Sequence, residues 1–299
     1  MRDFLSALAI SAFAAFSANA ESAFRLGDAV STPDWLTLKG EARVRYESLD
    51  GQFRANGTGG DQLLLFRTLL LAEVDAEFAS FGVELQDSRT YLGDDGTPLS
   101  SSIANPLDVL QAYVRFDELP GVLGESSTGS LTLGRQTISL GSKRQIERVD
   151  FANVIKSYTG ALYTSQNADG DQFHAILAVP TARFPNDKDE LFDNVLSGDE
   201  EQWNRKIWGL HYRHANVVPA LGSDIWGEVF VYGLNETDSD AFPTPDRDYV
   251  APGFRIYRKP KVDQWDIDLE VAGRFGSRRA SSADNTGREL DVSAAMTFL

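Results

Sequence analysis

Residues 36–47 read LTLKGEARVRYE, and this stretch decides the fold because apolar and charged side chains alternate along it. Its even-numbered positions include the apolar residues Leu36, Leu38, Ala42, Val44 and Tyr46. Its odd-numbered positions include the charged residues Lys39, Glu41, Arg43, Arg45 and Glu47. A period of two is that of a β-strand, whose successive side chains point to opposite faces. The stretch therefore predicts a strand with one apolar and one charged face.

The same alternation recurs along most of the chain. Residues 265–271 read WDIDLEV, and residues 64–76 repeat the pattern with Leu65 and Leu69 on the otherwise polar face. Further strands are predicted near 81–87, 107–117, 130–140, 158–164, 171–180, 204–214, 224–234, 252–258 and 288–298. About twelve strands of this kind predict an all-β, antiparallel fold.

Alternation alone fits either a soluble β-sandwich or a barrel in a membrane. Two features favour a transmembrane antiparallel β-barrel of the bacterial outer membrane: the full charges on one face, and connections that alternate in length. If the N-terminus is periplasmic, the outer connections are long, at 50–61, 88–106, 141–157, 181–203, 235–251 and 276–287. The inner ones are mostly shorter, at 77–80, 118–129, 165–170, 215–223 and 259–262.

The composition excludes several classes of protein. The 299 residues hold 28 Lys and Arg against 44 Asp and Glu, a net charge of −16 that argues against a nucleic-acid partner. The absence of Cys excludes disulfides, thiolate–metal sites and thiol nucleophiles. The Gly-x-Ser-x-Gly, His-Glu-x-x-His and P-loop motifs do not occur. We therefore expect no enzyme activity, no cofactor and no metal site.

The N-terminal segment is predicted to be a signal peptide, residues 1–20. An apolar run from Phe4 to Phe16 precedes Ala18-Asn19-Ala20, a small-x-small cleavage signal. The run is too short for a permanent membrane anchor. Residues 21–299 are then the mature, exported protein, predicted as a single β-barrel domain.

Three short motifs occur in order within residues 84–160. They are ELQDSR at 84–89, LDVLQAYV at 107–114, and LTLGRQ at 131–136 followed by the basic GSKR at 141–144. This order resembles the alginate export family of outer-membrane porins. The resemblance implies an eighteen-stranded barrel whose electropositive pore passes an anionic polysaccharide. It therefore favours a C-terminally incomplete chain over a barrel that closes with about twelve strands. Ser142-Lys143-Arg144 departs from the family in lacking an acidic residue before the basic ones.

Arginine carries the physical case for anion passage. A guanidinium binds a carboxylate through two parallel hydrogen bonds and stays charged at any working pH, and rings of Arg and Lys favour anions in pores. Strict alternation turns Arg135 towards lipid, unless a bulge or a snorkelling side chain at the rim turns it back. Each of these charges could instead be paired with a neighbouring carboxylate. The candidate pore residues are Arg43, Arg45, Arg67 and Arg115 on strands, Arg89, Lys143, Arg144 and Arg148 on adjoining loop segments, and Arg135.

The sequence thus predicts an outer-membrane channel for passive passage of an anionic, alginate-like polysaccharide or its oligomers. Its expected partners are that polymer, outer-membrane lipids and periplasmic export components. The acidic runs at 187–201 and 236–248 are expected in outer loops, where they account for much of the negative charge. Two alternatives stay open: a general or small-solute porin, and an exported soluble β-sandwich that binds or processes carbohydrate.

Overall fold

The computed structural model describes residues 32–50, 61–94, 96–219, 224–240, 242–284 and 286–299. Within these residues the fold is one antiparallel sheet in which each long strand pairs with the next along the chain. The predicted signal peptide lies outside the described residues. The strands are β1 (Leu36–Leu49), β2 (Asp61–Ala76), β3 (Ala79–Tyr91), β4 (Asn105–Pro120), β5 (Thr128–Gln136), β6 (Tyr158–Gln166), β7 (Gln172–Ala182), β9 (Arg205–His214), β10 (Trp226–Glu236), β11 (Asp248–Arg258), β12 (Ile267–Arg278) and β13 (Leu290–Phe298).

All twelve predicted strands are present, so the interpretation of the alternation is confirmed. Two small elements were not predicted: helix α3 (Lys188–Phe192) and the two-residue strand β8 (Glu200–Glu201), which pairs with β7. Both lie in the connection between β7 and β9. The strand predicted at 130–140 ends earlier, at Gln136, and residues 137–140 belong to the connection that follows it.

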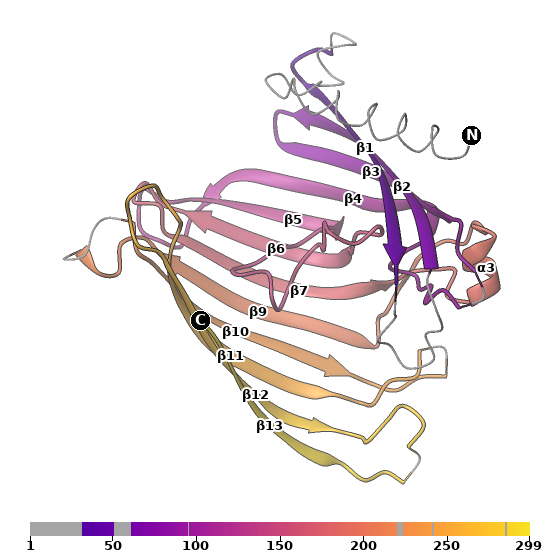
Figure 1. The fold of residues 1–299 in the computed structure, drawn as a ribbon. Coiled ribbons are helices and arrows are strands. Elements are labelled where there is room, and N and C mark those ends of the chain that lie inside the picture. Colours follow the sequence, from indigo (N-terminus) through magenta and orange to yellow (C-terminus); the bar gives the residue numbers. More distant parts are fainter. Residues whose placement is uncertain (1–31, 51–60, 95, 220–223, 241, 285) are drawn as a thin grey trace.

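The sheet is strongly curved, and β1 and β13 lie at its two opposite edges (Figure 1). No pairing joins β1 to β13 within the described residues. Closure with further strands therefore stays a prediction. Because all the long strands lie in one sheet, the soluble β-sandwich alternative is wrong.

The two faces of the sheet differ in the way that the sequence predicts. On β2 the side chains of Leu65 and Arg67 are 1% and 4% exposed, whereas Phe66 and Leu70 on the other face are 37% and 49% exposed. The face that carries the charged residues is thus the sheltered, concave one, and the apolar face is turned outward. Large exposed apolar side chains on the outward face are Val44, Tyr46, Phe66, Leu70, Val74, Phe81, Val83, Leu85, Leu133, Leu177, Leu210, Val229, Val250, Phe254 and Phe275.

The connections also alternate as predicted. Those at one end of the sheet are short, such as residues 77–78 between β2 and β3, and those at the other end are longer. The long connection at 137–157, which we call the strap, crosses the concave side of the sheet (Figure 1). No helix among the described residues is long and apolar enough to cross a membrane.

Two apolar clusters attach the strap to the two halves of the sheet. Ile138, Leu140 and Ile146 pack with side chains of β6, β7, β10 and β12, among them Tyr158 and Phe230. At the other end of the strap, Ile155 packs between Leu69 of β2 and Leu110 of β4. Leu69, one of the two leucines that interrupt the polar face of β2, is therefore part of the docking surface for the strap.

We expect Ile155→Ala to loosen the strap and to lower the free energy of unfolding by about 2–4 kcal/mol, since it removes a side chain that is 1% exposed. Urea unfolding of the refolded protein in detergent measures this change. Phe151→Ala, in the same strap but 82% exposed, is the control and should cost much less. Equal losses for the two variants would contradict the docking of Ile155.

Candidate functional site: the concave face and its strap

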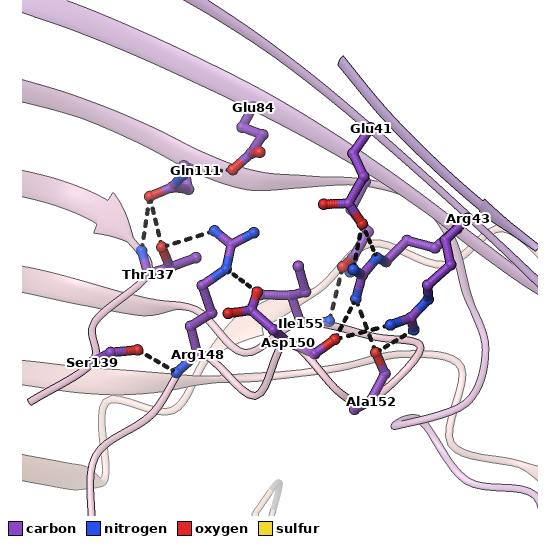
Figure 2. A network of polar contacts seen from close by, with 12 residues as sticks. Glu41, Arg43, Glu84, Gln111, Thr137, Ser139, Arg148, Asp150, Ala152 and Ile155 are labelled. Carbon is purple, nitrogen blue, oxygen red and sulfur yellow. Dashed lines mark hydrogen bonds and ion pairs between the residues drawn. The ribbon is translucent and has the colours of Figure 1, made fainter. Parts of the chain in front are cut away.

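The strap is held to the first strands by arginine side chains that bind its backbone. Arg43 and Arg67, direct neighbours across β1 and β2, both donate to the carbonyl oxygens of Asp150 and Ala152, at 2.7–3.0 Å. Arg67 also pairs with Glu41. Figure 2 shows Arg43 pointing from its strand towards this segment. Predicted as pore residues, they point inward as expected and are occupied in fixing the strap.

Asn153 completes this attachment. Its side-chain amide, in a residue that is 1% exposed, donates to the carbonyl oxygens of Ile103 and Phe66 at 2.8 and 3.1 Å. Its own carbonyl oxygen accepts from the Ser88 hydroxyl at 2.8 Å. The backbone amide of Ile155 then donates to Gln86 at 2.8 Å. Residues 150–155 are therefore bound to β1, β2 and β3 by polar contacts as well as by packing.

The base of the strap is tied to β4. Gln111 accepts from the backbone amide of Thr137 at 2.9 Å and donates to Glu84 at 2.5 Å. Arg148 reaches the Thr137 hydroxyl at 3.3 Å and pairs with Asp150 at 2.5 Å (Figure 2). Arg148 is thus placed on the strap, as predicted, and its charge is compensated there.

The turn of the strap lies against the opposite wall. Arg144 donates to Glu270 of β12 at 2.7 Å, and its guanidinium lies 4.3 Å from the centre of the Phe298 ring. Gly141, in the left-handed region with φ of 54°, approaches His211 so closely that a Cβ atom would lie 3.0 Å from Nε2. A side chain at position 141 would strain the backbone and force His211 or the strap to shift by a few tenths of an ångström. Lys143 is exposed in the same turn and has no carboxylate partner among the described residues.

The wall that receives Arg144 carries a row of alternating charges on neighbouring strands. Arg255 of β11 binds Asp268 of β12 through two hydrogen bonds of 2.7 and 2.8 Å and lies 3.4 Å from Glu228 of β10. Asp268 and Glu270 both face Arg144, at 3.9 and 2.7 Å. The carboxylates of β12 thus line the concave wall, as predicted, and each has a guanidinium partner.

A second polar group lies on β2, β3 and β4, towards the short-turn end. Arg115 pairs with Glu73 at 3.0 Å and with Asp117 at 2.8 Å. Tyr113 donates to the same Glu73, and Gly82 leaves room for its ring because a Cβ there would lie 2.4 Å from the ring. Arg115 faces inward, as predicted, and is already paired with wall acids.

Two of the candidate residues do not lie on the concave face. Arg89, expected on a loop segment, is within β3 on the face of Val83 and Leu85, where it pairs with Asp87 at 3.0 Å. Arg135 keeps the outward direction that strict alternation gives it. It lies next to the end of β5, where the Glu201 carboxylate at 2.7 Å and the Val109 carbonyl oxygen at 2.9 Å bind its guanidinium. Arg89 therefore faces outward and not inward as expected, and both residues lie on the outward face of the sheet.

Arg45 lies on the concave face together with Arg43 and Arg67. It pairs with Glu47 at 2.8 Å, donates to the Phe151 carbonyl oxygen at 2.7 Å and stacks on the Phe151 ring. Further inward or rim arginines were not among the predicted residues, among them Arg205, Arg255, Arg274 and Arg213, which stacks on Trp226 at 4.5 Å. The alternation in residues 252–258 already separates Arg255 from its apolar neighbours and would have identified it.

Outside the strands, the half-buried carboxyl of Asp199 couples the outer loop to the rim. Asp199 accepts from the side-chain amide of Asn105 at 2.7 Å and from the backbone amide of Phe184 at 2.9 Å. Burial, together with the neighbouring charge of Asp108, raises the pKa of Asp199 to about 6. The contribution of this group to stability is therefore largest below its ordinary pKa and is lost as the pH rises through about 6.

The class of protein follows from this arrangement. A meander of antiparallel strands, apolar outside and charged inside, with a long connection folded into the interior, is the architecture of an outer-membrane channel. The model of the family described as Alginate export matches residues 34–298, and the chain belongs to this family. Comparison with curated proteins gives no match, and comparison with solved structures gives none either. The family is one of porin-like outer-membrane export channels and not of enzymes, as the sequence analysis expected.

We expect Arg67→Gln to release the strap, because Arg67 is 4% exposed and supplies two of the four hydrogen bonds to residues 150 and 152. Hydrogen bonds from a charged donor are worth about 1.5–3 kcal/mol each, so exchange of the amides at 150–155 should rise by more than about tenfold. Hydrogen exchange measures this in detergent. Arg89→Gln removes a guanidinium that pairs with Asp87 on the outward face and is the control, and an equal effect there would argue against this attachment.

A second expectation concerns pH. Raising the pH from 5 to 8 should weaken the attachment of the 183–204 connection, since Asp199 becomes charged while buried beside Asp108. Limited proteolysis of this connection across that pH range measures the change. Asp199→Asn keeps a polar group of the same size and should abolish the dependence. A dependence that persists in this variant would assign it to another group.

Proposed function

We propose that the channel passes an anionic polysaccharide, or its oligomers, passively along inward-facing arginines. The observation that carries this proposal is the set of guanidinium–carboxylate pairs on the concave wall, in which Arg144 bridges from the strap to Glu270. Each of these arginines is already oriented towards a carboxylate group. The carboxylates of a uronic acid polymer have the same geometry and would replace the protein acids one after another.

The balance of charge suits passage rather than retention. Conduction requires binding that is strong enough to admit the solute and weak enough to release it. Arg255, Arg144 and Arg115 face Asp268, Glu270 and Glu73, so that a passing carboxylate competes with a protein carboxylate at each step. No chemical step is involved, and the polymer moves down its gradient.

The surroundings of such a channel complete the proposal. Residues 1–20 would be removed on export, the outward apolar side chains would contact outer-membrane lipids, and periplasmic export components would deliver the polymer at the short-turn end. Further strands would pair with the edges of β1 and β13 to close the barrel, because an unpaired edge in lipid is costly.

A general porin is the second candidate, and one observation favours it. Because most inward arginines are paired with acids, the concave wall has little excess charge and would also admit small neutral solutes. Block of the ion current by oligouronates separates the two functions: a general porin should be blocked no better by the acidic oligomer than by its neutral, carboxyl-reduced form.

We expect the double substitution Arg115→Gln with Arg144→Gln to shift ion selectivity towards cations, because it leaves Glu73 and Glu270 uncompensated on the concave wall. Reversal potential in a salt gradient at low ionic strength measures the shift, which should shrink at high salt. Single substitutions should give smaller shifts. Arg89→Gln removes the same charge from the outward face and is the matched control. An unchanged reversal potential in the double variant, or an equal shift with Arg89→Gln, would remove these arginines from the pore.

A further inference from the structure

A pocket of about 230 Å³ lies between the strap and the wall formed by β9 to β12, near the long-loop end. Gln145 and Ile146 of the strap form one side of it. The rings of Tyr158, Tyr232 and Tyr249 form much of the rest. The pocket therefore combines aromatic surface with a polar side chain, which is the usual composition of a small-molecule site.

The charge around this pocket is not balanced as it is elsewhere on the wall. The Glu236 carboxylate, whose side chain is fully buried, is shared by Arg205 at 2.8 Å and Arg247 at 2.6 Å. Arg274, on the rim of the same pocket, has no carboxylate partner among the described residues. Of the two guanidinium groups that line the pocket, Arg247 is paired with Glu236 and Arg274 is not, and the unpaired charge of Arg274 would attract an anion to this place.

Arg274 is positioned for such an anion. Its guanidinium carbon lies 5.6 Å from the centre of the Tyr249 ring, and its side chain is exposed. Arg247 is held by Glu236, whereas Arg274 makes no side-chain hydrogen bond to the residues that the structure describes and can donate to a ligand. An aromatic ring beside a free guanidinium presents an apolar surface and a carboxylate receptor at the same point.

We propose that this pocket is a subsite for a single sugar ring that carries a carboxylate. Arg274 binds the carboxylate, the Tyr249 ring packs against the C–H face of the sugar, and Gln145 bonds to its hydroxyl groups. Because one side of the pocket belongs to the strap, the subsite exists only while the strap is docked. This inference rests on the proposed function, for which it names one place where the polymer pauses.

Calorimetric titration of the full chain in detergent tests the subsite, with a hexuronic acid trisaccharide as the probe and its carboxyl-reduced, neutral form as the chemical control. The wild type should bind the acidic trisaccharide and not the neutral one. Arg274→Gln should weaken binding by about tenfold or more, as expected for the loss of a charge-assisted hydrogen bond. Arg274→Lys should restore part of it.

Arg278→Gln is the matched control, since Arg278 lies on the same strand and its guanidinium binds the carbonyl oxygens of Arg279 and Ala280, each at 2.8 Å, outside the pocket. It should bind like the wild type. Tyr249→Leu should weaken binding and Tyr249→Phe should not, and heat-modifiable migration on a gel verifies the fold of each variant.

The outcomes separate the subsite from the proposed function. If the acidic trisaccharide blocks the wild-type current but Arg274→Gln binds it with unchanged affinity, the subsite is wrong and the channel function stands. Equal weakening by Arg278→Gln would also overturn the subsite, since it would show a general effect of charge. If the wild type binds the acidic trisaccharide no better than the neutral one, the proposed subsite and the proposed preference for polyanions are both wrong.

Discussion

The interior of this channel depends on the attachment of one connection to two walls. Arg43 and Arg67 hold the carbonyl oxygens of residues 150 and 152 on one side, and Arg144 reaches Glu270 on the other. An arginine that binds backbone carbonyls gives up its donors but keeps its charge, so the clamp contributes both position and electrostatic potential. Without it, residues 137–157 would be held inside by apolar packing alone, and the carbonyl oxygens of residues 150 and 152 would lose their partners.

The strap also explains the mixed composition of the concave face. A wall that faced only water could be polar throughout, yet Leu65 and Leu69 lie on it, and Ile155 packs against Leu69. Apolar packing and polar anchoring are therefore combined in one contact. The packing supplies most of the stabilisation, since net hydrogen-bond contributions are small, whereas the polar groups fix the register in which the strap lies.

The strands could be predicted from the sequence because a period of two is a local property: one face of β1 or β12 can be recognised from a few residues. Helix α3 and strand β8 were not predicted, because elements of five and two residues are too short to show a periodic sequence pattern. Arg43, Arg67 and Arg144 were selected correctly as inward residues, but their partners lie 83–126 positions away in the chain, which no local pattern reveals. Arg89 was misplaced because the strand continues beyond the loop boundary that its neighbours suggested.

A net charge of −16 and the proposed preference for anions are compatible because charge acts locally in a channel. Asp87 and Asp248 face outward, Asp187 caps α3, and Asp238 is paired with Arg279 in an outer connection. These acids are separated from the interior by the sheet or by the length of a loop, and screening removes much of what remains. On the concave wall the acids serve instead to hold guanidinium groups in place. Where that pairing is incomplete, around Arg274, the interior is positive although the protein as a whole is not.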